Sequence, residues 1–375
     1  MKLMVIFGTR PEVIKLAPVI AEVQKHPSAI NLIVCSSGQH RHMLDQALAV
    51  FGITPQVDLS VMQEGQTLAE LTAKLINRVT AALLEYRPDV LMVQGDTTTA
   101  FASALAAFYL RIPVAHVEAG LRTGIWDSPF PEEFNRVAIS RIASWHFAPT
   151  RTAANCLHAE AVDPAKVFIT GNTVVDAIGM VQRRWAEPGH EHKFPVYFEN
   201  KRMVLVTTHR RENFGQGLGQ ICAAIKMLCT NHPEVGFVFP VHLNPEVRKV
   251  VFMELDGLPN LRLIEPVDFE ANLHLQSQCA LIITDSGGIQ EEAPSFGVPT
   301  VVMREHTERS DGVTAGFATL TGTDTRLIVS TAERYLGNPG LQAELQQRGN
   351  PYGDGLASQR IVGILSGSNV EAFNG

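Results

Sequence analysis

The sequence predicts an α/β protein with two Rossmann-like domains and a cleft between them, and three observations support this fold class. Short apolar stretches typical of buried strands alternate along the chain with longer stretches of helical period. The length of 375 residues exceeds what one hydrophobic core usually supports. The segment Glu187–Asn200 is rich in proline, glycine and charge and interrupts the alternation as a loop. We therefore expect domains at residues 1–185 and 186–356.

In the first domain, apolar stretches bounded by turn-forming residues indicate strands, and apolar residues at helical spacing fill the segments between them. The predicted strands are Lys2–Phe7, Leu32–Ser36, Val90–Gln94, Val114–Val117, Trp145–Ala148 and Val167–Ile169. The predicted helices are Glu12–Gln24, Arg41–Phe51, Leu68–Tyr86 and Thr99–Leu110. Because helical segments separate the strands, the sheet is expected to be parallel.

The second domain repeats this alternation. The predicted strands are Met203–Thr207, Gly236–Pro240, Leu261–Ile264, Leu281–Thr284 and Thr300–Val302. The predicted helices are Gly217–His232, Pro245–Met253, Asp268–Gln278, Ile289–Phe296, Arg326–Leu336 and Leu341–Gln347. Ligands of such folds bind outside the carboxyl ends of the strands, so polar residues that directly follow a strand are the candidate site residues.

Composition excludes several classes of protein. With 45% apolar and 18% charged residues, the chain resembles an ordinary globular protein, and its net charge of −7 argues against a nucleic-acid or anionic-membrane partner. No apolar run is long enough to span a membrane and no charged-then-apolar leader precedes the first strand, so a cytoplasmic location is expected. Five scattered cysteines without CxxC spacing are expected to be reduced. The histidine pairs His40/His42 and His190/His192 lack neighbouring Cys or Asp ligands, so no metal is expected.

The stretch Leu281–Pro299, LIITDSGGIQEEAPSFGVP, is the strongest indication of a ligand site. An apolar strand leads into a turn of Ser286, Gly287 and Gly288, where small side chains let backbone N–H groups approach a ligand. The helix that follows adds positive charge at its N-terminus, so the turn suits a phosphate group. Glu292, one turn further on, would be repelled by that phosphate unless it binds another group, such as ribose hydroxyls. The alternative is a tight strand–helix turn whose acids only complement the helix dipole.

Four carboxylates follow predicted strands or begin a helix in the first domain. Asp96 follows Gly95 at the end of one strand, and Glu118 ends the next. Glu132 and Glu133 lie at a predicted helix start, where one of them could merely complement the helix dipole. Asp96 alone could be a helix N-cap. Asp96, Glu118 and Glu132 together suit proton transfer, because neighbouring carboxylates shift each other's pKa values apart.

Basic residues follow strands in both domains. Arg10 and Lys15 surround the first turn of the first predicted helix and could share an anion site there. His209 and Arg210 follow the first strand of the second domain, which suits a diphosphate or a leaving group, with a solvated charge run as the alternative. His242 ends another strand and could contact a ligand or make a structural hydrogen bond.

Nine segments make the chain closely resemble the bacterial non-hydrolysing UDP-N-acetylglucosamine 2-epimerases over nearly its whole length. They are FGTRPEVIKLAP, QHRHMLDQ, QGDTTTAFASALAAFYLRIPVAHVEAGLRTG, SPFPEEFNR, ITGNTVVDA, THRREN, PVHLNP, TDSGGIQEEAPSFGVP and NPYGDG. The resemblance implies a glycosyltransferase-B-like fold whose last helix, near 357–375, packs back on the first domain. It also implies a homodimer, a UDP-sugar substrate and a reaction without metal, NAD or other cofactor. UDP would be eliminated to give a 2-acetamidoglucal and then re-added, with inversion at C2.

The resemblance also assigns residue roles. It gives proton transfer to Asp96, Glu118 and Glu132, and makes His209 necessary for activity. Diphosphate binding falls to Arg10 and Lys15 with Ser286 and Gly287, and ribose binding to Glu292; Gly288 and Arg309 belong to the same substrate site. A second, regulatory substrate site would include Gln39, His40, Arg210, Glu132 and His242.

The chain departs from the family pattern at several positions. His42 and Gly65 stand where Gln and Arg are expected in the regulatory site. Asn272 stands where an aromatic residue usually contacts uracil, and Arg309 is kept although the Pro-Glu-Ala that usually follows it is lost. These departures leave open an epimerase for another UDP-2-acetamido sugar, with His306 as the one new candidate cation. Further alternatives are a glycosyltransferase or silent UDP-sugar-binding protein of the same fold, and a hydrolysing epimerase.

Overall fold

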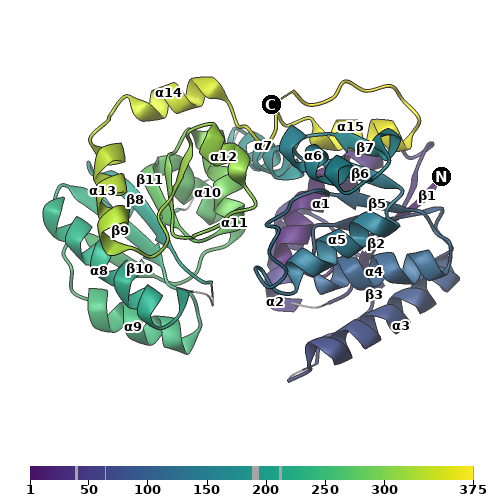
Figure 1. Cartoon of the computed structure of the whole chain (residues 1–375), viewed down its shortest axis with the longest axis horizontal. Helices are drawn as coiled ribbons and strands as arrows, with labels where there is room; N and C mark the ends of the chain where they lie inside the picture. The colour runs from purple at the N-terminus through teal and green to yellow at the C-terminus, as the bar shows by residue number, and fades with distance from the viewer. Residues whose placement is uncertain (39–40, 64, 188–193, 211–212, 375) are drawn as a thin grey trace. The chain divides into compact units, whose positions relative to one another are not determined.

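The computed structural model describes residues 1–38, 41–63, 65–187, 194–210 and 213–374. The chain divides into two compact units, an N-terminal unit of residues 1–180 with 352–375 and a C-terminal unit of residues 181–351. In Figure 1 the yellow C-terminal helix α15 (Ala357–Leu365) lies among the purple and blue elements of the N-terminal unit. The division falls within helix α7 (Thr173–Trp185), the last residue of which is the predicted domain boundary.

A seven-stranded parallel sheet forms the centre of the N-terminal unit, in the order β3-β2-β1-β4-β5-β6-β7. Its strands are β1 (Lys2–Phe7), β2 (Asn31–Ser36), β3 (Val57–Asp58), β4 (Val90–Gln94), β5 (Val114–Val117), β6 (Trp145–Ala148) and β7 (Val167–Ile169). Side chains on both faces of β1 and β4 are buried, which explains why these strands are continuously apolar in sequence.

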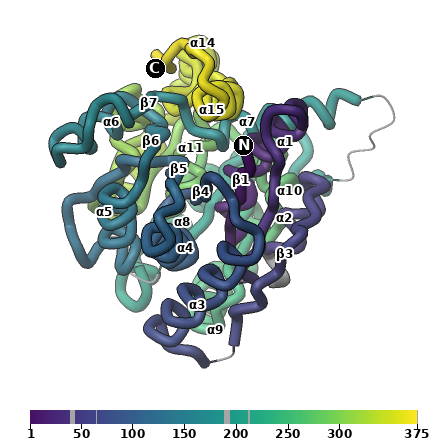
Figure 2. Tube along the Cα trace, turned by 90° about the vertical axis from the view of Figure 1, so that its right-hand side faces the viewer, coloured from purple at the N-terminus to yellow at the C-terminus, as the bar shows by residue number. Residues whose placement is uncertain are grey.

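Helices cover both faces of this sheet. They are α1 (Arg10–Gln24), α2 (Arg41–Phe51), α3 (Leu68–Tyr86), α4 (Thr98–Tyr109), α5 (Glu132–Ile142), α6 (Arg151–Ala159), α7 and α15. One core joins alternate residues of β1 to α3 and α4, and a second joins the other residues of β1 to α1, α2 and α15. Figure 2 shows this arrangement, with α3 and α4 on one side of the strands and α15 on the other. The last helix therefore supplies part of the core of the N-terminal unit.

The C-terminal unit contains a six-stranded parallel sheet in the order β10-β9-β8-β11-β12-β13. Its strands are β8 (Arg202–Thr207), β9 (Val235–Pro240), β10 (Leu261–Ile264), β11 (Cys279–Thr284), β12 (Thr300–Val302) and β13 (Ala318–Leu320). Its helices are α8 (Gln216–Asn231), α9 (Pro245–Leu255), α10 (Phe269–Gln278), α11 (Gly287–Glu292), α12 (Ser310–Thr314), α13 (Thr325–Leu336) and α14 (Leu341–Arg348). Residues of β8, β9 and β11 form one core with α8, α9 and α13.

The predicted class, an α/β protein with two Rossmann-like domains, is confirmed, and every predicted strand is present. The edge strands β3 and β13, which have two and three residues, and the helices α6, α7 and α12 were not predicted from the sequence. The prediction that a helix begins at Ile289 is wrong, because α11 begins at Gly287 with Ser286 as its N-cap. A 3-10 turn, Ala293–Phe296, then replaces the second half of the predicted helix. Within the described residues, no helix is long and apolar enough to cross a membrane.

Candidate functional site

Residues predicted to act on a ligand gather at the carboxyl ends of the strands in each unit. In the N-terminal unit they follow β1, β4 and β5, which are neighbours in the sheet. Gly95 and Glu118, the first residues after β4 and β5, both have a φ of +66°. A residue with a side chain rarely adopts this conformation, so contacts with neighbouring residues must hold the Glu118 backbone in it. A Cβ atom at Gly95 would lie 3.6 Å from Glu118 Oε2, so the two strand ends meet at this carboxylate.

Lysine and amide donors hold the Glu118 carboxylate. Lys15 Nζ from α1 and Gln94 Nε2 from the end of β4 donate to its two oxygens, and Asn172 Nδ2 lies 3.4 Å from Oε1. The side chains of Lys15 and Glu118 are 8% and 7% exposed. Lys15 was predicted to bind an anion together with Arg10. In the structure it forms an ion pair with Glu118, a predicted catalytic acid. Arg10, the first residue of α1, is half-buried.

Helix α5 positions Asp96. Arg136 Nη2 donates to Asp96 Oδ2, and Asn135 Nδ2 donates to the Asp96 carbonyl over 2.8 Å. The Asp96 side chain is 26% exposed, whereas that of Arg136 is 5% exposed. Asp96 is therefore a carboxylate with a buried cationic partner and an accessible face, and it is more than a helix cap; Thr97 is the N-cap of α4.

The two glutamates at the start of α5 have different surroundings. Glu133 is buried, accepts hydrogen bonds from the Thr123 and Gly124 N–H groups, and lies 3.2 Å from Arg136. It therefore holds the preceding loop and orients the arginine that pairs with Asp96. Glu132 is half-buried and remains the predicted acid of this pair.

Glu12 is a polar residue of this region that was not among the predicted site residues. It is fully buried in α1 and accepts hydrogen bonds from Gly8 N, Thr9 N and Thr9 Oγ1. Thr97 Oγ1 donates to its other oxygen over 2.8 Å, so Glu12 ties the loop after β1 to the loop after β4. Burial raises the pKa of Glu12 to about 7, although these hydrogen bonds favour the charged form. Its place three residues after Thr9, as in a helix capping box, is the sequence signal for it.

Asp285 is the second missed residue and the centre of the site in the C-terminal unit. Its fully buried carboxylate follows β11 and accepts hydrogen bonds from Thr208 Oγ1 (2.7 Å), His209 N (3.1 Å), Arg210 N (3.0 Å) and Asn213 Nδ2 (3.0 Å). Burial raises the pKa of Asp285, but hydrogen bonds and charge from His209, with those from Thr208 and Arg210, outweigh it and bring the pKa to about 2. The residue before the predicted Ser-Gly-Gly turn thus fixes the loop after β8.

His209 and His242 lie near each other after the adjacent strands β8 and β9. His209 Nδ1 is 3.2 Å from Asp285 Oδ1, and the centroids of the two imidazole rings are 6.2 Å apart. Burial and the neighbouring His209 lower the pKa of His242, and its Nδ1 accepts a hydrogen bond from Asn244 N. Arg210 Nε donates to the Asp285 carbonyl over 3.1 Å. The structure therefore places His209 and His242 near each other, and His242 makes one of its two predicted alternatives, a structural hydrogen bond.

Arg309 packs against the start of α11. A Cβ atom at Gly287 would lie 2.8 Å from Arg309 Cζ, so only glycine allows this close approach. Arg309 Nε donates to Glu291 Oε1 over 2.9 Å and Nη1 donates to Glu308, both of which are buried carboxylates. Ser286 N donates to Thr284 Oγ1, which fixes the turn into the helix. A guanidinium group thus lies beside the N-terminus of α11, an arrangement suited to an anion.

Glu292 lies on the other side of the same short helix. Gln276 Nε2 donates to its Oε2 over 2.6 Å, and Asn272 Nδ2 lies 3.4 Å from that oxygen. A Cβ atom at Gly288 would lie 3.4 Å from Glu292 Oε1, so this carboxylate faces the glycine. The short helix α11 therefore has a cation, Arg309, beside its start and a carboxylate, Glu292, at its end. The cation suits a phosphate and the carboxylate suits ribose hydroxyls.

Several residues of the predicted regulatory site are not described by the structure. Gln39 and His40 lie outside the described residues, as does the side chain of His42, and Gly65 adopts a positive φ of 72° in a loop. Among the described residues, His, Cys, Asp and Glu side chains form no group of three that could hold a metal ion.

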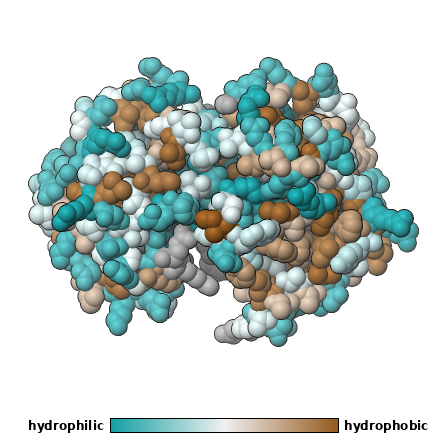
Figure 3. All heavy atoms as spheres, viewed as in Figure 1, coloured by the Kyte–Doolittle hydropathy of each residue, from teal (hydrophilic) through white to brown (hydrophobic). Residues whose placement is uncertain are grey.

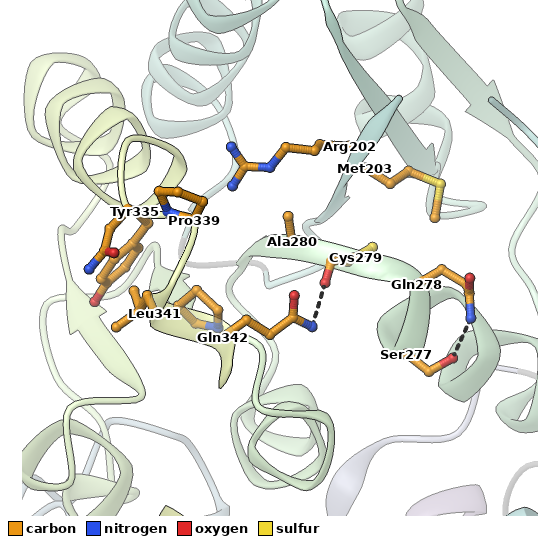
Figure 4. A pocket seen from close by; sticks show the side chains of 12 residues that line it. Arg202, Met203, Ser277, Gln278, Cys279, Ala280, Tyr335, Pro339, Leu341 and Gln342 are labelled. Carbon is orange, nitrogen blue, oxygen red and sulfur yellow. Dashed lines mark hydrogen bonds between the residues drawn. The ribbon is translucent and has the colours of Figure 1, made fainter. Parts of the chain in front are cut away.

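A cavity of about 290 Å³ in the C-terminal unit contains none of the predicted site residues. Its lining includes Arg202, Cys279 and Gln342, and Figure 4 shows their side chains around the starts of β8 and β11. It therefore lies at the amino ends of the strands, whereas the candidate site is at their carboxyl ends.

Comparison with known proteins gives one consistent result. A family model described as UDP-N-acetylglucosamine 2-epimerase matches residues 21–366. A UDP-N-acetylglucosamine 2-epimerase from Escherichia coli (strain K12) is 45% identical over 375 residues, covering 99% of this chain and 100% of the relative. An enzyme of the same name from Campylobacter jejuni is 44% identical over 384 residues, covering 99% of both chains.

Solved structures agree with these matches. The UDP-GlcNAc 2-epimerase from Neisseria meningitidis, bound to UDP-GlcNAc, is 44% identical with a TM-score of 0.93, covering 97% of this chain and 99% of that one. The enzyme from Methanocaldococcus jannaschii, in complex with UDP-GlcNAc and UDP, is 34% identical with a TM-score of 0.85, covering 98% and 100%. These similarities confirm the predicted glycosyltransferase-B-like fold class.

Proposed function

Because the chain belongs to the UDP-N-acetylglucosamine 2-epimerase family, we propose that it interconverts UDP-N-acetylglucosamine and UDP-N-acetylmannosamine by inverting the sugar at C2. The observation that carries this proposal is the pair of carboxylates at adjacent strand ends, Asp96 beside Arg136 and Glu118 beside Lys15. A protein that only bound a UDP-sugar would need the nucleotide contacts of the C-terminal unit. It would have no use for acids that are held in charged pairs at the ends of β4 and β5.

The proposed reaction is an elimination followed by an addition. A carboxylate removes the proton from C2, a C1–C2 double bond forms, and the C1–O bond breaks with its electron pair leaving on UDP. UDP then adds back at C1 while a proton returns to the opposite face of C2. The three acids Asp96, Glu118 and Glu132 supply and accept these protons. These steps move protons and the UDP group and no hydride, so the proposed reaction requires no NAD.

Residues of the C-terminal unit hold the leaving group in this proposal. Arg309 and the N–H groups after Ser286 stabilise the charge that develops on the diphosphate. Glu292 binds the ribose hydroxyls, and its contacts with Gln276 and Asn272 support that position. The family resemblance also assigns Arg10 and Lys15 of α1 to the diphosphate, and His209, Arg210 and His242 to the substrate.

The deciding experiment is incubation with UDP-N-acetylglucosamine in deuterated water, followed by NMR of the sugar. We expect UDP-N-acetylmannosamine with deuterium at C2, and return of deuterium to C2 of the starting sugar. If deuterium entered C2 of another UDP-2-acetamido sugar but not of UDP-N-acetylglucosamine, that sugar would be the substrate of the same mechanism. Release of free N-acetylmannosamine would select a hydrolysing enzyme, and no exchange with any of these sugars would contradict the proposal.

We also propose that the chain forms a homodimer through an aromatic face of the N-terminal unit. Phe108 and Tyr109 of α4 are 57% and 64% exposed, and Phe134 of α5 and Trp126 of the preceding loop are 49% and 59% exposed. Phe134 packs edge-on against Phe101 of α4, so the two helices share this surface. Figure 3 shows apolar residues gathered over α4 and α5. Light scattering of Phe108→Glu should give a monomer where the unchanged chain gives a dimer; identical masses would contradict this interface.

A further inference from the structure

Asp285 is a fully buried carboxylate without an assigned part in the proposed reaction, although it contacts more of the loop after β8 than any other side chain described above. We propose that Asp285 is a positioning residue that holds His209 with its ring proton on Nδ1 and so leaves Nε2 as the atom that meets the substrate. This inference rests on the proposed function, in which His209 lies beside the departing UDP.

The geometry fixes both the backbone and the ring of His209. Its backbone N lies 3.1 Å from both oxygens of the Asp285 carboxylate, and its ring Nδ1 lies 3.2 Å from Oδ1. An ionised carboxylate can only accept hydrogen bonds, so a neutral imidazole in this position must carry its proton on Nδ1. Nε2 then bears the lone pair, or donates a proton when the ring is charged.

The remaining contacts of Asp285 keep it in this role. Thr208 Oγ1 and Arg210 N donate to the same carboxylate, so it cannot turn away from the ring without losing several hydrogen bonds. Its pKa of about 2 keeps it ionised over the whole range in which a histidine titrates. The His209 side chain is 45% exposed, so the ring is fixed on one side and open on the other.

Asp285 and His242 lie beside the His209 ring, and Arg210 follows His209 in the chain. Asp285 Oδ1 lies 3.2 Å from His209 Nδ1, the centroid of the His242 ring is 6.2 Å away, and Arg210 Nε donates to the Asp285 carbonyl. Burial and the neighbouring His209 lower the pKa of His242. The alternative role for Asp285 is purely structural: it would build the loop and leave the proton position of His209 unset.

The test compares the unchanged protein with Asp285→Asn by NMR of the chain labelled with ¹⁵N-histidine, at a pH where the His209 ring is neutral. We expect the Nδ1–H tautomer in the unchanged protein and a shift toward Nε2–H in the variant, because the amide can donate to Nδ1. We also expect kcat to fall by about 10² to 10⁴, with the Kd for UDP changed by less than about threefold. An Nε2–H ring in the unchanged protein, an unaltered tautomer in Asp285→Asn, or a kcat that falls only in step with UDP affinity would overturn the proposal.

Thr208→Val is the matched control, because it removes one hydrogen bond to the same carboxylate and leaves the ring contact intact. We expect it to keep the Nδ1–H tautomer. If Asp285→Asn does not fold, the tautomer in the unchanged protein and in Thr208→Val still decides the question. The NMR and UDP-binding measurements do not require turnover, so an inactive protein with the Nδ1–H tautomer would contradict the proposed function and leave only the control of the His209 tautomer by Asp285 standing.

Discussion

Glu12 in the N-terminal unit and Asp285 in the C-terminal unit are both fully buried carboxylates at the ends of central strands, and both accept several hydrogen bonds. Burial raises the pKa of Glu12 to about 7, whereas hydrogen bonds and charge from His209 help to bring the pKa of Asp285 to about 2. The difference comes from the partners. Glu12 is held by hydroxyl and N–H groups, while Asp285 also has a histidine ring at 3.2 Å.

The same contrast extends to the rest of each strand-end region. In the N-terminal unit the predicted catalytic acids are themselves members of the ion pairs, with Lys15 and Arg136 as their partners. In the C-terminal unit, buried acids orient the cation Arg309, which is predicted to bind phosphate. In the proposed reaction the same kind of sheet therefore has two tasks: carboxylates exchange protons in one unit, and carboxylates orient donors toward the leaving group in the other.

The largest expected effect concerns Asp96. Asp96→Asn keeps the shape of the side chain but removes the charge paired with Arg136, so we expect loss of the proton-transfer step and a fall in kcat of about 10² to 10⁴. Deuterium incorporation at C2 measures this step directly. The Kd of Asp96→Asn for UDP should change by less than about threefold. The control is Asp89→Asn, at the amino end of β4, which should keep the kcat of the unchanged protein. If Asp96→Asn lost UDP affinity but retained turnover, the proposal that the N-terminal unit transfers protons while the C-terminal unit binds UDP would be contradicted.

Glu12→Gln tests the raised pKa through stability. Between pH 4.5 and about 7 the folded chain binds more protons than the unfolded chain, because folding raises the pKa of Glu12. The free energy of unfolding that Glu12 contributes therefore falls as the pH rises through this range and is constant above it. Relative to the unchanged protein, the variant should gain up to about 3 kcal/mol between pH 5 and pH 8 in urea unfolding.

Glu70 provides the control for this experiment. It follows the N-cap of α3 by three residues, as Glu12 follows that of α1, but it is exposed and hydrogen bonds from Thr67 lower its pKa. The difference in stability between Glu70→Gln and the unchanged protein should therefore be the same at pH 5 and pH 8. If the stability differences of Glu12→Gln and Glu70→Gln depended on pH in the same way, burial would not be the cause of the pH dependence at Glu12.

Arg309 tests the grip on the diphosphate. Arg309→Met removes a charged donor and leaves Glu291 and Glu308 without one of their partners, so the Kd for UDP should rise about 10- to 100-fold. Arg309→Lys should recover part of the affinity, because it restores charge without the planar fork. Calorimetry measures both, and Arg348→Met, an exposed arginine on α14, serves as the control. Unchanged UDP affinity in Arg309→Met would remove Arg309 from the binding site.

The smallest expected effect concerns Gln276, whose amide lies 2.6 Å from Glu292. Gln276→Met should let this carboxylate move, and the preference for UDP over 2′-deoxy-UDP should fall about tenfold. The matched control is Gln278→Met, two residues along the same helix, where the side chain is exposed. An unchanged preference in Gln276→Met would mean that Glu292 does not need this contact to recognise ribose.

The sequence indicated the strands and the polar residues after them, because continuous apolar runs in a parallel sheet have few other interpretations. It did not indicate the partners of those residues. Lys15 and Glu118 are 103 positions apart, and Asp285 contacts a loop more than 70 positions earlier, so only the strand order brings them together. Neither sheet's order could be read from local patterns.

The choice between Glu132 and Glu133 shows the same limit at short range. Both begin α5, and sequence alone left open which of them serves the fold. The structure separates them because Glu133 is 2% exposed and bonded to the preceding loop. The edge strands β3 and β13 were missed because two or three residues carry too little pattern to detect.

The return of residues 352–375 to the N-terminal unit has a consequence for synthesis of the chain. Asp176 of α7 accepts hydrogen bonds from Ala357 N and from Ser358 N and Oγ, and residues of α15 complete the core beside β1. The domain that leaves the ribosome first therefore lacks part of its core until the final residues emerge, while the C-terminal unit has all of its residues earlier. Premature termination near residue 350 would spare the later domain and leave the earlier one unfinished.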